Sequence, residues 1–146
     1  MQGDAVRILL VEDDSDHAEL IIRGLQANRV ANQITHVSDG EAALDYLFQR
    51  GEYADAAKNP RPHLILLDLR LPKIDGLEVL KEVKEDNELR SIPVVVLTTS
   101  KADADLEKAS EYHVNSYLVK PVDFEEFRRM MGDIGYYWLI WNQQPV

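Results

Sequence analysis

Runs of consecutive apolar, β-favouring residues constrain the fold of this chain more than any other feature. Three long runs fall at Arg7–Val11, His63–Leu67 and Ile92–Leu97, and two shorter ones at Ile34–Val37 and Ser116–Val119. A strand with one face in water alternates apolar and polar residues, whereas a strand buried on both faces is apolar throughout. The runs therefore predict a parallel sheet that is covered on both faces.

Amphipathic segments separate these runs and predict the covering helices. Apolar residues recur at helical spacing in five segments: after Asp14 or Ser15, from about Asp39, after Gly76, from Ala102 to about His113, and from Asp123. Gly51–Pro62 is polar and contains two prolines, so it predicts a loop. Five strands alternating with five helices, joined by right-handed crossovers, predict a doubly wound α/β fold. Such folds bind ligands at the carboxyl ends of their strands.

Polar residues collect at these strand ends. Glu12 and Asp13 follow the first strand, Asp68 the third, Thr98 the fourth and Lys120 the fifth. Carboxylates that meet at one sheet edge repel each other unless a cation neutralises them, and oxygen ligands of this kind suit Mg²⁺. A lysine and a hydroxyl beside them suit a phosphoryl group. Each residue alone is typical of a solvated loop; the agreement of four strand ends favours a site.

Composition narrows the classes of protein. The chain has no cysteine, which excludes disulfides and thiolate metal sites and fits a cytoplasmic protein. Twenty-six acidic residues against 16 basic ones give a net charge of −10, which disfavours nucleic acid as a partner. No stretch approaches the roughly 20 apolar residues of a membrane span, and the N-terminus is unlike a signal peptide.

Four motifs bring the chain close to a known family. They are Ile8–Asp14 (ILLVEDD), Leu66–Gly76 (LLDLRLPKIDG), Val95–Thr98 (VVLT) and Tyr117–Pro121 (YLVKP). In this order they resemble the motifs of response-regulator receiver domains of two-component systems, over about residues 6–134. The resemblance implies a flavodoxin-like strand order, 2-1-3-4-5. It also implies a receiver domain at residues 6–135, followed by an aromatic tail at 136–146 and no output domain.

The resemblance assigns chemical roles to the acidic residues. Asp68 matches the residue that accepts a phosphoryl group from a histidine kinase. Asp13, Asp68 and the backbone carbonyl of Arg70 match the direct Mg²⁺ ligands, and Glu12 matches an acid that acts on the metal through water. Arg70 also places a long cation beside the site, and its effect on the lifetime of the phosphoryl group stays open.

Three further residues match the family's switch and phosphoryl contacts. Thr98 and Tyr117 match the coupled switch pair, and Lys120 matches the lysine that contacts the phosphoryl group. The resemblance implies that the Lys120–Pro121 bond is cis. Thr99 departs from the pattern, because many receivers have Ala or Gly there, and this leaves the phosphoryl lifetime open as well.

Two segments point to a subfamily. The Gly51–Pro62 loop and the aromatic run Tyr136–Trp141 are similar to those of phytochrome-associated single-domain response regulators. This similarity implies a phytochrome-type histidine kinase as partner, and a homodimer that forms through the C-terminal face. Six large side chains in a row cannot all face one core; the alternative to a dimer is a monomer whose tail packs on its own domain.

Three classes of function fit an aspartate with Mg²⁺. The first, which the motifs favour, is a switch that signals by phosphorylation-dependent protein contact and is not an enzyme beyond its own phosphorylation and dephosphorylation. The second is an aspartate-dependent phosphatase, but those typically have a second Asp two residues after the nucleophile, where this chain has Arg70. The third is a receiver that serves only as a scaffold, which the intact set of site residues disfavours.

Overall fold

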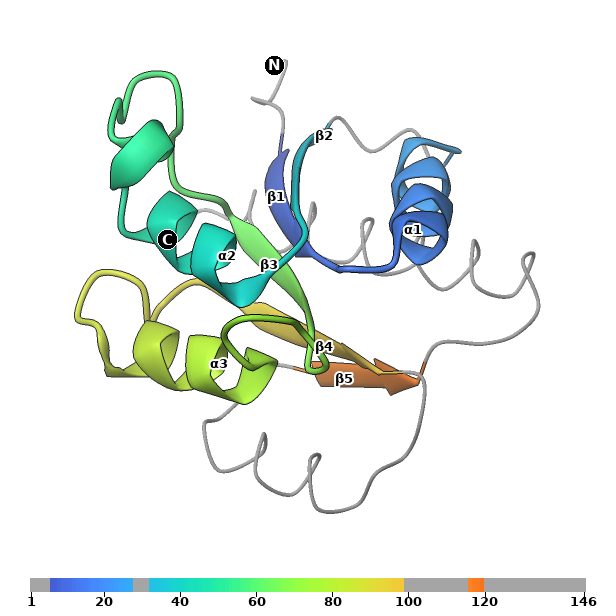
Figure 1. Cartoon of the computed structure of the whole chain (residues 1–146). Helices are drawn as coiled ribbons and strands as arrows, with labels where there is room; N and C mark the ends of the chain where they lie inside the picture. Colours follow the sequence, from blue (N-terminus) through green and yellow to red (C-terminus); the bar gives the residue numbers. More distant parts are fainter. Residues whose placement is uncertain (1–5, 28–31, 99–115, 120–146) are drawn as a thin grey trace.

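A five-stranded parallel sheet forms the centre of the molecule (Figure 1). The computed structural model describes residues 6–27, 32–98 and 116–119. The strands are β1 (Val6–Val11), β2 (Asn32–Val37), β3 (Leu64–Asp68), β4 (Val94–Thr98) and β5 (Ser116–Val119). They lie in the order β2-β1-β3-β4-β5, and every neighbouring pair is parallel. The predicted doubly wound fold and its flavodoxin-like strand order are confirmed.

Helices cover both faces of this sheet. The described helices are α1 (Ser15–Ala27), α2 (Gly40–Leu47) and α3 (Gly76–Glu85). Figure 1 shows α1 on one face, and α2 and α3 side by side on the other. β1, β3 and β4 each divide their residues between two apolar clusters; in β1, Leu9 and Val11 face α2 and α3, while Ile8 and Leu10 face α1. This division explains why the strands are apolar throughout.

An aspartate side chain caps the N-terminus of each of the three described α-helices. Asp14 Oδ1 accepts hydrogen bonds from the backbone N–H groups of Asp16 and His17, at 2.9 and 3.1 Å, so Asp14 rather than Ser15 caps α1. Asp39 Oδ1 accepts from an N–H of the first turn of α2 at 2.7 Å, and Asp75 Oδ1 accepts likewise in α3 at 2.9 Å. Each cap satisfies N–H groups that have no partner within the helix.

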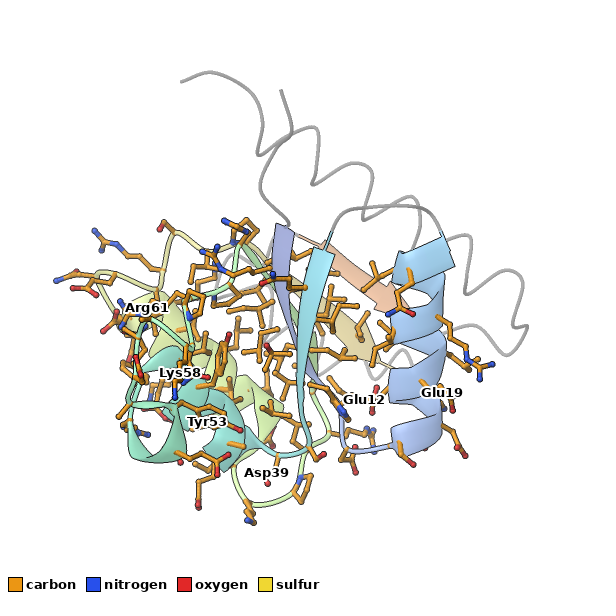
Figure 2. The ribbon with its side chains drawn as sticks, turned by 90° about the horizontal axis from the view of Figure 1, so that it is seen from above. Glu12, Glu19, Asp39, Tyr53, Lys58 and Arg61 are labelled. Atoms are coloured by element: carbon orange, nitrogen blue, oxygen red, sulfur yellow. The ribbon has the colours of Figure 1, made fainter. Side chains whose placement is uncertain are left out.

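The Gly51–Pro62 loop is more regular than its sequence suggests. Gly51–Tyr53 forms a short 3₁₀ helix, too short to leave a periodic pattern in the sequence. The Tyr46 hydroxyl of α2 donates to the Pro60 carbonyl at 2.9 Å, and Arg61 Nε donates to the Leu47 carbonyl at 3.0 Å. The loop is therefore attached to the side of α2, where Figure 2 shows Tyr53 and Arg61.

Several predictions concern residues that the structure does not describe. The expected helices at 102–113 and from Asp123, the Lys120–Pro121 bond, Thr99 and the aromatic tail all lie outside the described residues. Within the part of the chain that is described, no helix is long and apolar enough to cross a bilayer.

Candidate functional site

Strand register brings the predicted site residues to one edge of the sheet. Val11 pairs with Leu67, so Glu12 and Asp68 occupy equivalent positions at the ends of adjacent strands. The carboxylate oxygens of Glu12, Asp13 and Asp68 lie within 4.8 Å of one another. The predicted convergence of the three acids is therefore confirmed.

The three acids differ in their surroundings. Glu12 is fully buried and Asp68 is 6% exposed, whereas Asp13 is exposed. Glu12 Oε2 accepts a hydrogen bond from the Asp14 backbone N–H at 3.2 Å. His36 Nε2 donates to the Glu12 backbone carbonyl at 2.7 Å. Buried carboxylates require such partners or a nearby cation, because burial removes their hydration.

One backbone hydrogen bond orients the Asp68 carboxylate. The Arg70 N–H donates to Asp68 Oδ1 at 2.8 Å, so the start of the β3–α3 loop turns back over the end of β3. Gly76, the first residue of α3, closes the loop, because its N–H donates to the Leu69 carbonyl at 3.2 Å. A Cβ on Gly76 would lie 2.5 Å from the Asp68 carbonyl oxygen, so only glycine fits this approach.

The donor set fits a divalent cation with a preference for oxygen. Ligands about 2.1 Å from one Mg²⁺ are at most about 4.2 Å apart, so oxygens within 4.8 Å of one another need only small side-chain shifts to share an ion. The described residues place no other group of three or more His, Cys, Asp or Glu side chains this close together. The acids therefore fit the magnesium site that the sequence predicts.

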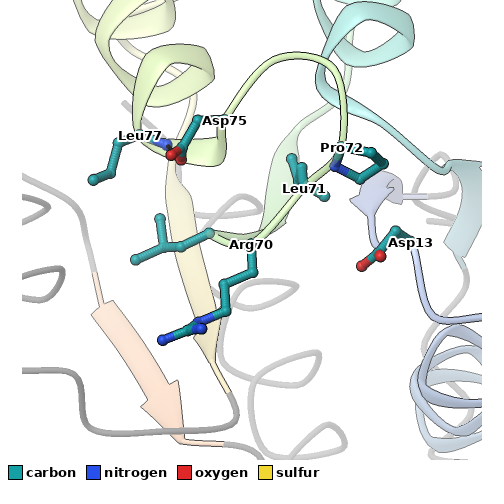
Figure 3. Close-up of a pocket in the computed structure, with 7 residues that line it drawn as sticks. Asp13, Arg70, Leu71, Pro72, Asp75 and Leu77 are labelled. Atoms are coloured by element: carbon teal, nitrogen blue, oxygen red, sulfur yellow. Dashed lines mark hydrogen bonds between the residues drawn. The ribbon is translucent and has the colours of Figure 1, made fainter.

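A hollow of about 440 Å³ opens beside these acids (Figure 3). Asp13 lines one side of it, and the start of α3 lines the other with Asp75 and Leu77. Arg70, which is exposed, and the apolar side chains of Leu69, Leu71 and Pro72 complete the wall. Asp13, the exposed member of the acidic cluster, is thus open to a small solute or to a side chain of a partner protein.

The remaining predicted site residues are placed only in part. Thr98 is the last residue of β4 and pairs with Val119 of β5, so the backbones of these strands end at the same sheet edge as Asp68. Tyr117 pairs with Val96. The side chains of Thr98 and Tyr117, and Lys120 as a whole, lie outside the described part.

Sequence reasoning missed two neighbours of the site. His36 precedes the last residue of β2, so its position at this edge could have been inferred, but its hydrogen bond to Glu12 could not. Gly40 begins α2, and its N–H donates to the Pro72 carbonyl of the β3–α3 loop at 3.4 Å. No motif or spacing in the sequence links these two positions.

Comparison with known proteins identifies the family. The model of the response regulator receiver domain matches residues 8–131 of the chain. The chain belongs to the response regulator receiver family. The fold, the acidic cluster and the strand order described above are those that its motifs imply, and its function is phosphorylation-based signalling in two-component systems.

Two relatives align with most of this receiver. The probable methanogenesis regulatory protein FilR2 of Methanothrix harundinacea is 49% identical over 142 residues, which cover 97% of this chain and 89% of the relative. Response regulator Rcp1 of Synechocystis is 44% identical over 132 residues, which cover 90% of this chain and 88% of Rcp1.

Solved structures agree with these relationships. The Mn²⁺-bound form of Rcp1 has a TM-score of 0.86 at 42% identity, and the phosphorylated cyanobacterial phytochrome response regulator RcpA has a TM-score of 0.89 at 42% identity. Each comparison covers 97% of this receiver and 99% of the solved chain. Phytochrome response regulators are therefore among its relatives.

Proposed function

We propose that this receiver accepts a phosphoryl group on Asp68 from a histidine kinase, with Mg²⁺ held by Asp13, Asp68 and the Arg70 carbonyl. The observation that supports this most is the orientation of Asp68, whose Oδ1 is held by the Arg70 N–H while the other two carboxylates lie within 4.8 Å. Glu12, which is fully buried, acts on the metal through water. The Mn²⁺-bound form of Rcp1 is consistent with a divalent cation.

In the proposed reaction an Asp68 carboxylate oxygen attacks the phosphorus of a phosphohistidine. The new bond joins oxygen to phosphorus, the phosphorus–nitrogen bond breaks, and the imidazole nitrogen leaves with the bonding electrons and takes up a proton. Mg²⁺, when bound, offsets the charge that gathers on the phosphoryl oxygens. The protein positions the nucleophile and needs no separate base, because a carboxylate nucleophile, unlike a hydroxyl group, has no proton to lose as it attacks.

The proposal also includes three residues whose side chains the structure does not describe. Lys120 contacts the phosphoryl group, and the Thr98 hydroxyl donates to it, which leaves room that Tyr117 then occupies. This movement biases an equilibrium between two existing states. In Thr98→Ala we expect phosphorylation to persist while its effect on partner affinity disappears; an unchanged effect on affinity would contradict the coupling.

The proposal extends to the phosphodonor and to the cellular compartment. We propose a phytochrome-type histidine kinase in the cytoplasm as the phosphodonor, because relatives at 42–44% identity include Rcp1 and a cyanobacterial phytochrome response regulator. We also propose that the receiver unit spans residues 6–135 and that the aromatic segment 136–146 forms a homodimer contact.

One experiment separates the function classes. The full chain is incubated with a small phosphodonor, with and without Mg²⁺, and its intact mass is followed over time. A switch acquires one phosphoryl group only with Mg²⁺ and loses it slowly. Continuous consumption of phosphodonor without a lasting adduct would support a phosphatase, and no adduct under any condition would overturn the proposed function.

A further inference from the structure

The β3–α3 loop, residues 69–75, carries the proposed metal ligand and is attached to the sheet at both ends. At its start the Arg70 N–H donates to Asp68, and at its end the Gly76 N–H donates to Leu69. Between these points, residues 71–75 extend away from the end of β3 and lead into the start of α3 (Figure 3). The position of the Arg70 carbonyl therefore depends on how this middle part is held.

The start of α2 holds the middle of the loop. The Gly40 N–H donates to the Pro72 carbonyl at 3.4 Å. Gly40 is buried, and a Cβ built on it would overlap the carbonyl group of Ile74. The loop backbone thus occupies the space that any other residue at position 40 would need. Figure 2 shows Asp39, the residue before Gly40, at the same end of the sheet as Glu12.

Lys73 shows that the loop conformation needs support from outside. Its φ is 66°, in the left-handed region that residues other than glycine and asparagine rarely adopt. Such a conformation persists only where the surroundings hold it. The Lys73 ammonium lies 3.7 Å from Asp39 Oδ2 and is 59% exposed, so this ion pair contributes little. The Gly40 N–H bond to Pro72 and the close approach of Gly40 to Ile74 supply such support from α2.

We propose that Gly40 is a positioning residue for the metal and phosphoryl site. It acts through Pro72 and Ile74, and it fixes the Arg70 carbonyl and the Arg70 N–H that orients Asp68. The inference rests on the proposed function, because it takes the Arg70 carbonyl as a metal ligand. A methyl group at position 40 pushes the loop away from α2 and displaces both Arg70 groups.

The test compares two glycine variants of the full chain. Gly40→Ala places a methyl group against the loop. Gly51→Ala also destabilises the protein, because Gly51 has a φ of 61°, but a Cβ there would meet only Asp45 Oδ2, at an ordinary contact distance of 3.8 Å, and Gly51 lies in the 3₁₀ helix, outside the β3–α3 loop. Mg²⁺ affinity is measured by calorimetry, and amide hydrogen exchange is measured in the metal-free state.

A positioning role predicts different results for the two variants. Mg²⁺ affinity should fall about tenfold in Gly40→Ala, as it does when a group that orients a metal ligand is removed, and should be unchanged in Gly51→Ala. Exchange of the Arg70 amide should be faster only in Gly40→Ala. Equal Mg²⁺ affinity and equal Arg70 exchange in the two variants would overturn the inference.

Two further comparisons distinguish failure of this inference from misfolding of the variant and from failure of the proposed function. If Gly40→Ala does not fold, the double variant Gly40→Ala/Lys73→Gly is compared with the single variant Lys73→Gly instead. Glycine at position 73 adopts the left-handed conformation without strain and so helps the double variant to fold. The double variant should bind Mg²⁺ more weakly than Lys73→Gly, and equal affinity would overturn the inference. A wild-type protein that binds no Mg²⁺ would overturn the proposed metal site, while Arg70 exchange without metal would still decide whether Gly40 holds the loop.

Discussion

Glu12 and Asp13 are adjacent in the sequence, yet the fold buries the first completely and leaves the second exposed. Asp13 lines the hollow beside the site and can bind or release an ion without any movement of the core. Glu12 is held by hydrogen bonds to its side chain and to its backbone. We expect an ion to enter and leave past Asp13, while Glu12 stays fixed behind the site.

Substitution of Asp68 tests the assignment of the phosphoacceptor. Asp68→Asn should acquire no phosphoryl group from a small phosphodonor with Mg²⁺, because an amide oxygen is a poor nucleophile. The fold should be retained, since the amide oxygen can still accept the hydrogen bond from the Arg70 N–H. Intact mass and circular dichroism measure these two properties. A stable adduct that maps to another residue of Asp68→Asn would contradict the assignment.

Substitution of Asp13 tests the mutual repulsion of the acids. Asp13→Asn should lose most of its Mg²⁺ affinity, and it should gain about 1 kcal/mol in free energy of unfolding without metal, because one like charge near two others is removed. Urea unfolding and calorimetry measure the two effects. Asp16→Asn is the control, since Asp16 is exposed and outside the acidic cluster; the idea fails if both variants bind Mg²⁺ as wild type does.

Helices and strands could be predicted where their signals are local in the sequence, and could not where they depend on contacts between distant segments. Apolar runs and capping aspartates are local signals, so the strands and the start of α2 could be predicted to within a few residues. Asp68 and the other acids could be placed together because parallel strands end at one edge. The contact of Gly40 with Ile74 could not be predicted, because it depends on how a loop and a distant helix pack.

For the N-cap of α1 the sequence left two candidates, Asp14 and Ser15. Asp14→Ala should lower the free energy of unfolding by about 1 kcal/mol, because two N–H groups of the first turn lose their acceptor. Ser15→Ala should change it little, since Ser15 is the first residue within the helix. Chemical denaturation of both variants in Mg²⁺-free buffer gives the comparison. A larger loss for Ser15→Ala would show that Ser15 is the cap.

For the molecule as a whole, the two ends of the sheet are built differently. At the amino ends of the strands, Arg7 Nε donates to the Arg61 carbonyl at 3.0 Å, and the Arg7 N–H donates to His63 Nδ1 at 2.9 Å. At the carboxyl ends, helix starts and the β3–α3 loop surround the acids. We expect a phosphorylation-dependent change to begin at the carboxyl ends, because the acids lie there.

Self-association is the prediction that belongs to the whole chain. The full-length protein should form a dimer at high micromolar concentration, because six consecutive large apolar and aromatic residues, Tyr136–Trp141, are typical of an association surface. A version that ends at Gly135 should be monomeric with the same circular dichroism. Light scattering measures both. A full-length protein that stays monomeric, phosphorylated or not, would exclude the dimer.

The strand order also determines when the site can come into existence. β1 lies between β2 and β3, and Leu64, the β3 residue that pairs with Ile8, comes more than 50 residues further along the chain. During synthesis Glu12 and Asp13 emerge long before Asp68, and closure of so long a loop is slow compared with local helix formation. A newly made chain therefore has no acidic cluster, and cannot take part in signalling, before β1 and β3 have paired.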